Sequence, residues 1–101
     1  MENITPQELQ KWMDENRPFF LLDVREDFER EEFNIGGFHI SMNENSQLKD
    51  FISNSDKPIV VYCAKGIRSA IVLQRYAEFC NVPIYNLTGG MLGWQTTFTT
   101  K

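Results

Sequence analysis

The amino-acid sequence predicts an α/β domain in which a parallel sheet is covered by helices on both faces. Short runs rich in β-branched and aromatic residues alternate with segments of helical pattern, which is typical of that class. The run 19–24 is almost entirely apolar, as expected of a strand that is buried on both faces. With 101 residues, 42% of them hydrophobic, the chain has the size of one domain, and we expect residues 1–101 to form it.

The first helix has a start that residue chemistry explains. Thr5 can cap the helix, Pro6 loses no hydrogen bond at the first helical position, and Glu8 can reach back to complete a capping box. We expect this helix to run to about Glu15 and to stop before Pro18, because a proline disfavours helical geometry in the residue before it.

The later elements follow in chain order, and one unit among them is the most informative. We expect strands at 19–24, 38–40, 58–62 and 82–87, and helices at 25–32, 46–52, 69–80 and 91–98. In the unit 58–80, a β-branched strand leads through a short loop, 63–68, into a helix. Ligands of open α/β sheets bind outside the carboxyl ends of the strands, so this loop is the expected site.

Cys63 stands at the carboxyl end of that strand and begins the loop. A loop that curls from a strand into a helix turns successive N–H groups inwards, and the helix N-terminus adds partial positive charge. Gly66 can take a positive φ where the curl is tightest, and Lys65 and Arg68 bring cations to the rim. These features favour the thiolate of Cys63, so we expect its pKa below the ordinary value of about 8.5. A thiolate is nucleophilic without a histidine beside it.

The cysteines and the histidine also admit other interpretations. Cys63 as an inert core residue is disfavoured, because such a cysteine needs neither a glycine nor two cations around it. His39, the single histidine, invites a Cys–His pair, but nothing in the sequence places it near Cys63, and we expect a structural role. Cys80 could form a disulfide with Cys63, but about twelve helical residues separate them by roughly 18 Å, and a disulfide needs Cα atoms within about 7 Å. We therefore expect Cys80 in the core.

Charged and aromatic residues elsewhere carry weaker signals. Asp23 and Arg25 stand at a strand end, where charge is seldom buried without a partner. One or both could line the pocket mouth, with Arg25 binding the donor; we favour a structural pair in which Asp23 orients the active loop. The acidic run at 26–32 is expected to be a solvated helix face, although it could dock a basic partner. Trp12 and Trp94 are expected to pack in the core or at its rim.

Composition and charge argue against several classes of protein. The net charge is −4 and no basic stripe is present, so we expect no nucleic-acid partner. The N-terminus lacks a signal-peptide pattern and no apolar stretch is long enough to span a bilayer, so we expect no membrane association. Two cysteines are too few for a disulfide framework or a structural zinc, and we expect neither a metal nor another cofactor. A reducing cytoplasm is the simplest setting.

Four pieces of the sequence resemble the single-domain rhodaneses, and the resemblance covers nearly the whole chain. In order, they are Leu22-Asp23-Val24-Arg25, Ile59-Val60-Val61-Tyr62-Cys63, Gly66-Ile67-Arg68-Ser69, and Leu87-Thr88-Gly89-Gly90 with Trp94 after it. The resemblance implies a rhodanese-like, three-layer fold: a five-stranded parallel sheet with helices on both sides. The family's usual Gly-His-Ile-x-Gly-Ala stretch reads Phe38-His39-Ile40-Ser41-Met42-Asn43 here, so the path of the segment 35–43 is left open.

The resemblance also implies a sulfurtransferase. Cys63 would attack the outer sulfur of a donor and hold it as a persulfide. The backbone amides of the loop would stabilise the charge, and Lys65 and Arg68 would attract an anionic donor. The loop residues expected to bind substrate are Ala64, Lys65, Gly66, Ile67, Arg68 and Ser69. The cationic loop resembles the loops of thiosulfate-type enzymes in the family. We therefore expect thiosulfate or a protein persulfide as donor and a thiol or cyanide as acceptor. The alternative is a sulfur-relay or protein-binding module, served by a sulfur-delivering protein, with no useful turnover of small donors.

Loop length separates this chemistry from phosphate chemistry. Dual-specificity phosphatases of the cell-cycle type share the fold but place five residues between cysteine and arginine, which leaves room for three phosphate oxygens. Here the four residues from Ala64 to Ile67 lie between Cys63 and Arg68. The shorter loop suits a single sulfur anion, so we expect no phosphatase activity.

Overall fold

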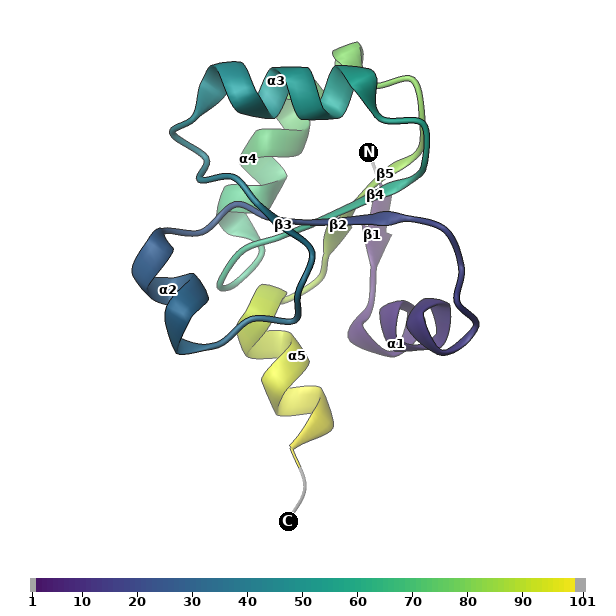
Figure 1. Ribbon diagram of the computed structural model, residues 1–101. Coiled ribbons are helices and arrows are strands. Elements are labelled where there is room, and N and C mark those ends of the chain that lie inside the picture. Colours follow the sequence, from purple (N-terminus) through teal and green to yellow (C-terminus); the bar gives the residue numbers. More distant parts are fainter. Residues whose placement is uncertain (1, 100–101) are drawn as a thin grey trace.

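The computed structural model describes residues 2–99 and has a five-stranded parallel sheet between two helical layers (Figure 1). The strand order is β1-β5-β4-β2-β3. The strands are β1 (Glu2–Ile4), β2 (Phe20–Asp23), β3 (Phe38–His39), β4 (Ile59–Tyr62) and β5 (Ile84–Leu87). The helices are α1 (Pro6–Asp14), α2 (Asp27–Glu32), α3 (Asn45–Asn54), α4 (Ile67–Tyr76) and α5 (Gly90–Phe98), with a 3₁₀ turn, η1, at Ala77–Phe79. The predicted α/β class is confirmed.

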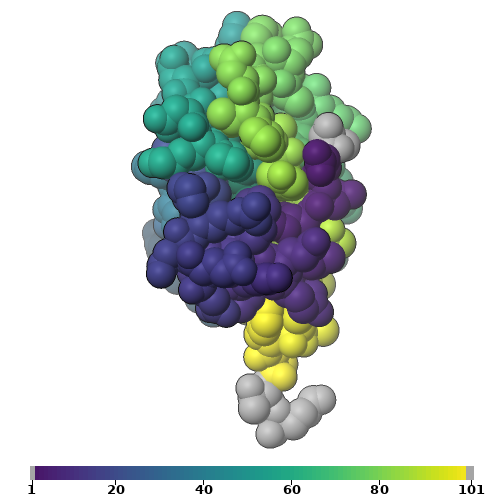
Figure 2. Space-filling model, turned by 90° about the vertical axis from the view of Figure 1, so that its right-hand side faces the viewer, coloured from purple at the N-terminus to yellow at the C-terminus, as the bar shows by residue number. Residues whose placement is uncertain are grey.

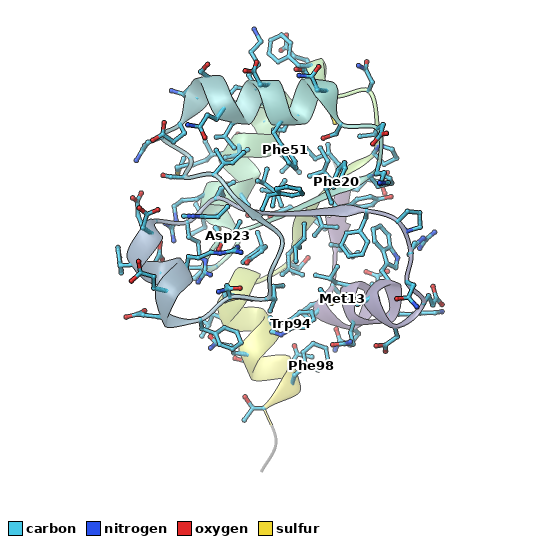
Figure 3. The ribbon with its side chains drawn as sticks, in the orientation of Figure 1. Met13, Phe20, Asp23, Phe51, Trp94 and Phe98 are labelled. Carbon is cyan, nitrogen blue, oxygen red and sulfur yellow. The ribbon has the colours of Figure 1, made fainter. Side chains whose placement is uncertain are left out.

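Each face of the sheet buries its own hydrophobic core. Phe20 and Phe51 lie on the face covered by α3 and α4, whereas Met13 and Trp94 lie on the face covered by α1 and α5 (Figure 3). Side chains alternate between the faces along β4: Ile59 and Val61 join the first core, and Val60 and Tyr62 join the second. This alternation decides which layer the next residue, Cys63, faces.

The N-terminal segment confirms one prediction and adds a strand that the sequence did not indicate. The Thr5 hydroxyl accepts from the Glu8 amide at 3.1 Å, and the Glu8 carboxylate accepts from the Thr5 amide at 2.9 Å, so the capping box is present. Ahead of it, β1 pairs with β5, with Ile4 opposite Leu87. Only Ile4 of this three-residue strand is buried, which leaves no periodic pattern to detect.

The helix after β4 differs from the predicted 69–80 at both ends. It begins at Ile67 because Gly66, with φ +98°, forms its N-cap and turns the chain two residues earlier than expected. It ends at Tyr76 and continues as η1, so Cys80 lies beyond the helix. The earlier start matters for function, because it brings the helix N-terminus closer to Cys63.

The two ends of α5 have different surroundings. The α5 helix extends beyond the body of the domain, where it is coloured yellow in Figure 2. Its N-terminal end, by contrast, lies against the loop between β4 and α4.

Among the described residues, no helix is long and apolar enough to cross a membrane.

Candidate functional site

Cys63 follows β4 directly and lies under the N-terminus of α4. It has the same parity as Ile59 and Val61, so its side chain points to the face that α4 covers. The residue is 1% exposed, yet it lines an open pocket of about 320 Å³ together with Ala64 and Lys65 of the following loop and Ile67 and Arg68 of the first turn of α4. The sulfur is therefore enclosed by loop backbone and still open to a small molecule.

The Cys63 sulfur accepts hydrogen bonds from its own loop. The amide of Gly66 lies 3.1 Å from Sγ and the amide of Ser69 lies 3.3 Å from it. Burial raises the pKa of the thiol, whereas hydrogen bonds from the backbone amides of Ser69, Lys65 and Gly66 lower it, and the pKa lies below the ordinary value. The inward-facing amides expected from the sequence are present, and they favour a thiolate nucleophile at this position.

The first turn of α5 supports the same loop from the opposite side. The Met91 amide donates to the Cys63 carbonyl at 2.8 Å, and the Leu92 amide donates to the Ala64 carbonyl at 2.9 Å. These amides belong to the first turn of a helix and have no partner within it, so the loop carbonyls satisfy them. Gly90 makes the close approach possible, because a Cβ there would lie 2.4 Å from the Cys63 carbonyl oxygen.

Glu29 of α2 fixes Arg68 through a two-pronged ion pair. The two terminal guanidinium nitrogens of Arg68 donate to the two carboxylate oxygens of Glu29, each at 2.7 Å. The expectation that the acidic run is only a solvated face is therefore wrong for Glu29, which joins α2 to the active loop. The pair also balances the charge of Arg68, which the sequence suggested would attract an anionic donor.

Acid is expected to weaken the contribution of this pair. Hydrogen bonding to Arg68 lowers the pKa of Glu29 from 4.5 to about 2. A carboxylate with a lowered pKa stabilises the fold fully above about pH 4.5, and that stabilisation is lost as the pH falls towards 2. Glu29→Gln is expected to lower the free energy of unfolding by about 1 kcal/mol at neutral pH. In urea unfolding, the difference in free energy of unfolding between wild type and Glu29→Gln should shrink as the pH falls from 4.5 to 2. A difference that stays constant with pH would contradict this assignment.

A second, larger pocket adjoins the first at Ala64 and Lys65. Its volume is about 420 Å³, and Ala64 and Lys65 line both pockets. The larger pocket is also lined by Arg25, Glu29, Glu32, Phe33, Met91, Leu92 and Gln95. Among the described residues, Lys65 forms no ion pair, so it is the cation of the loop that remains open to an anionic ligand.

Asp23 and Arg25 form a buried pair next to the site. The Asp23 side chain is fully buried and receives Arg25 Nε at 3.0 Å and a terminal nitrogen of Arg25 at 2.9 Å. The same Arg25 nitrogen donates to the Phe33 carbonyl at 2.6 Å, and Arg30 also reaches Asp23, at 3.5 Å. The structural interpretation fits this geometry: Asp23 anchors the segment that carries Glu29. Arg25 nevertheless lines the larger pocket, so a contact with substrate stays a proposal.

The remaining candidates lie apart from the Cys63 sulfur. His39 contacts the Arg25 carbonyl at 2.8 Å through Nε2, which fits the structural role expected of it and ties β3 to the segment after β2. Cys80 is a free, partly buried thiol packed against the core around Leu73 and donating to the Val82 carbonyl. Trp12 and Trp94 pack at the edge of the second core, as expected.

Comparisons with known proteins identify the family of this chain. The model of the rhodanese-like domain matches residues 5–97, which is nearly all of the chain. The chain belongs to the rhodanese-like domain family. The crystal structure of a rhodanese-like domain protein from Staphylococcus aureus is similar to this domain, with a TM-score of 0.78 and 32% identity over 93% of this chain and 91% of that one.

Two curated relatives of this rhodanese-like domain carry sulfurtransferase names. It is 32% identical to thiosulfate sulfurtransferase GlpE of Coxiella burnetii, covering 92% of this chain and 88% of GlpE. It is 30% identical to the "probable adenylyltransferase/sulfurtransferase MoeZ" of Mycobacterium tuberculosis, covering 90% of this chain. The chain spans only 24% of the length of MoeZ, so the likeness concerns one part of that protein. These two relatives connect the chain with the sulfurtransferases of this family.

Three residues that shape the site in this rhodanese-like domain were missed by sequence reasoning. In the sequence, Glu29 belongs to the expected solvated face, Gly90 stands out only within the family-like piece 87–90, and Asn86 is one residue of an expected strand. A polar residue inside an apolar strand is a signal that could have drawn attention to Asn86, because buried polar groups need partners. For Glu29 no local signal exists, since its partner lies 39 residues away in the chain.

Proposed function

We propose that this protein is a sulfurtransferase that moves a sulfane sulfur from thiosulfate or a persulfide donor to a thiol or cyanide through Cys63. The Cys63 thiolate attacks the outer sulfur of thiosulfate, the sulfur–sulfur bond of the donor breaks, and sulfite leaves with the bonding electrons. Cys63 then carries a persulfide. A cyanide or thiolate acceptor attacks the outer sulfur of that persulfide, and the Cys63 thiolate is restored for the next cycle.

One observation carries the proposal: Sγ of Cys63 accepts hydrogen bonds from the amides of Gly66 and Ser69, and Cys63 lines an open pocket. These fixed dipoles stabilise a sulfur anion without reorganising during the reaction. The exposed Lys65 at the pocket mouth favours an anionic donor. Since Cys63 must be a free thiol between turnovers, the chemistry suits the cytoplasm, where thiols are kept reduced.

A second candidate is a sulfur-relay module that receives its sulfur from another protein. The charge balance of the site favours it: Arg68 is paired with Glu29 and Arg25 with Asp23, which leaves less positive charge for a small dianion. Ile67, 69% exposed, and Leu92, 53% exposed, lie at the two pockets and offer apolar surface to a protein. In this version Cys63 still carries the persulfide, but small donors turn over slowly.

The experiment that tests the proposal mixes the protein with thiosulfate and cyanide and measures thiocyanate. We expect turnover by the wild type and none by Cys63→Ala, whereas Cys80→Ala should keep full activity because Cys80 lies beyond the C-terminal end of α4, and Cys63 lies at its N-terminal end. Equal rates for wild type and Cys63→Ala would reject the catalytic role. An aryl phosphate serves as a counter-substrate, and hydrolysis that depends on Cys63 would favour a phosphatase instead.

Intact-mass spectrometry separates the two candidates. After exposure to a persulfide donor, either version predicts a gain of one sulfur atom on the wild type and none on Cys63→Ala. Rapid loss of that sulfur to cyanide indicates the enzyme acting on small molecules, whereas a loaded protein with slow thiosulfate turnover indicates the relay. No adduct under any condition would contradict both.

A further inference from the structure

Asn86 is linked to Cys63 through the Ser69 hydroxyl, and the proposed chemistry assigns it no role. It sits on β5 opposite Val61 of the neighbouring strand β4, and it faces the same side of the sheet as Ile84, towards α4. The residue is 8% exposed, and both ends of its side-chain amide are hydrogen-bonded. A polar side chain buried in a strand needs such partners, and the identity of these partners ties Asn86 to the active loop.

The orientation of the Asn86 amide follows from its partners. On one side it lies 3.1 Å from the Gly66 carbonyl, which can only accept, so the NH₂ group must face Gly66. The amide oxygen must therefore face the Ser69 hydroxyl, which lies 2.5 Å away. Two oxygens at that separation need a proton between them, and the amide oxygen has none to give. Ser69 consequently donates its hydroxyl proton to Asn86.

This assignment leaves Cys63 without the Ser69 proton. The Ser69 hydroxyl lies 3.3 Å from Sγ and carries a single hydrogen, which it donates to the Asn86 amide oxygen. The hydroxyl therefore presents a lone pair to the sulfur and can accept from the thiol, but it does not stabilise the thiolate. The thiolate depends instead on the backbone amides of Gly66 and Ser69.

The geometry points to Asn86 as a positioning residue that withholds the Ser69 hydroxyl proton from Cys63 and so limits how strongly the thiolate is stabilised. The benefit follows from thiol chemistry: an over-stabilised thiolate is a weaker nucleophile, and the best attacking thiol ionises near the ambient pH. A side chain that restrains the stabilisation keeps the sulfur reactive. The inference rests on the proposed function only in naming Cys63 as the sulfur carrier.

The charged groups around the sulfur do not supply the same effect. Arg68 acts on Cys63 through its charge, but Glu29 from α2 balances it. Lys65 is exposed at the mouth of the pocket, and the Asp23–Arg25 pair forms no hydrogen bond to Sγ. Neither β5 nor the first turn of α5 places a charged side chain against the sulfur. These groups are unchanged by substitution of Asn86, so a titration can isolate its contribution.

The test is the rate of alkylation of Cys63 by iodoacetamide as a function of pH, with no sulfur donor present and the modified residue identified by peptide mass spectrometry. In Asn86→Leu the hydroxyl loses its acceptor and turns to the sulfur. We expect the pH midpoint of the alkylation rate to fall by about one unit. At a pH well below the midpoint, this corresponds to about tenfold more thiolate. Asn86→Val, which suits a strand, also lacks an acceptor and is expected to shift the midpoint in the same direction.

The decisive control removes the hydroxyl. In a Ser69→Ala background, Asn86→Leu is expected to leave the midpoint where Ser69→Ala alone puts it. The Gly66 carbonyl keeps the Ala70 amide as a partner in every variant, so the loop backbone is not left unsatisfied. An unchanged or raised midpoint in both Asn86 variants overturns the inference, and so does an equal shift in the Ser69→Ala background. Because no donor is used, a protein that fails to transfer sulfur can still show the shift.

Discussion

Asp23→Ala is expected to lower the free energy of unfolding by about 3–5 kcal/mol, because it leaves a buried guanidinium without its counter-ion. Asp23 is fully buried and Arg25 is 4% exposed, so little water reaches the guanidinium to replace the lost carboxylate. The carboxylate also accepts from the Arg25 amide at 3.0 Å and attracts Arg30, so one substitution removes several contacts at the end of β2, where Asp23 lies in Figure 3. Urea unfolding followed by circular dichroism measures the loss.

Asp27→Ala is the matched control for this prediction. Asp27 also belongs to the segment after β2, but its side chain is 88% exposed, so its removal is expected to change stability by less than about 1 kcal/mol. Replacing both members of the buried pair, as in Asp23→Leu with Arg25→Met, removes both charges and should recover much of the loss. If Asp23→Ala proved as mild as Asp27→Ala, the pair would not anchor this edge of the domain.

Gly90→Ala is expected to disturb the active loop more than any other single methyl group. The new Cβ would lie 2.4 Å from the Cys63 carbonyl oxygen and 2.7 Å from the Ala64 carbonyl carbon, and both are backbone atoms that cannot rotate away. Gly90 also has φ +58°, which alone costs a non-glycine residue about 1–2 kcal/mol. Relief requires α5 to move off the loop and to give up the bonds from Met91 and Leu92.

The expected result is a loss of about 2–4 kcal/mol of stability and about a hundredfold in thiocyanate formation, because the reacting sulfur is displaced from its amides. Gly36→Ala provides the comparison: Gly36 has φ +92°, but a Cβ there would meet nothing within 4 Å. That variant should show only the conformational cost and full activity. Equal effects in the two variants would mean that the contact between α5 and the loop has no part in placing Cys63.

Much of the fold could be predicted because each element carries its own signals. The capping box of Thr5 and Glu8, the apolar strand 58–62 and the glycine at 66 are contiguous patterns whose physics needs no distant partner. The edge strand β1 was missed because its single buried residue leaves no pattern, and β5 supplies the pairing that defines it. The length of the helix after the loop was misjudged because Gly66 starts it early and η1 ends it early.

The sequence by itself determined that a cysteine ends a buried strand, that a glycine loop follows it and that a helix begins immediately afterwards. This is enough to place the Cys63 sulfur among backbone amides, since all of these groups are neighbours along the chain. Only the tertiary structure decided what surrounds that loop: Glu29 on Arg68, Met91 under Cys63, and Asn86 on Ser69. The physical reason is the strand order β1-β5-β4-β2-β3, which sets β5 and β2 on either side of β4 and carries α5 and α2 to the Cys63 loop.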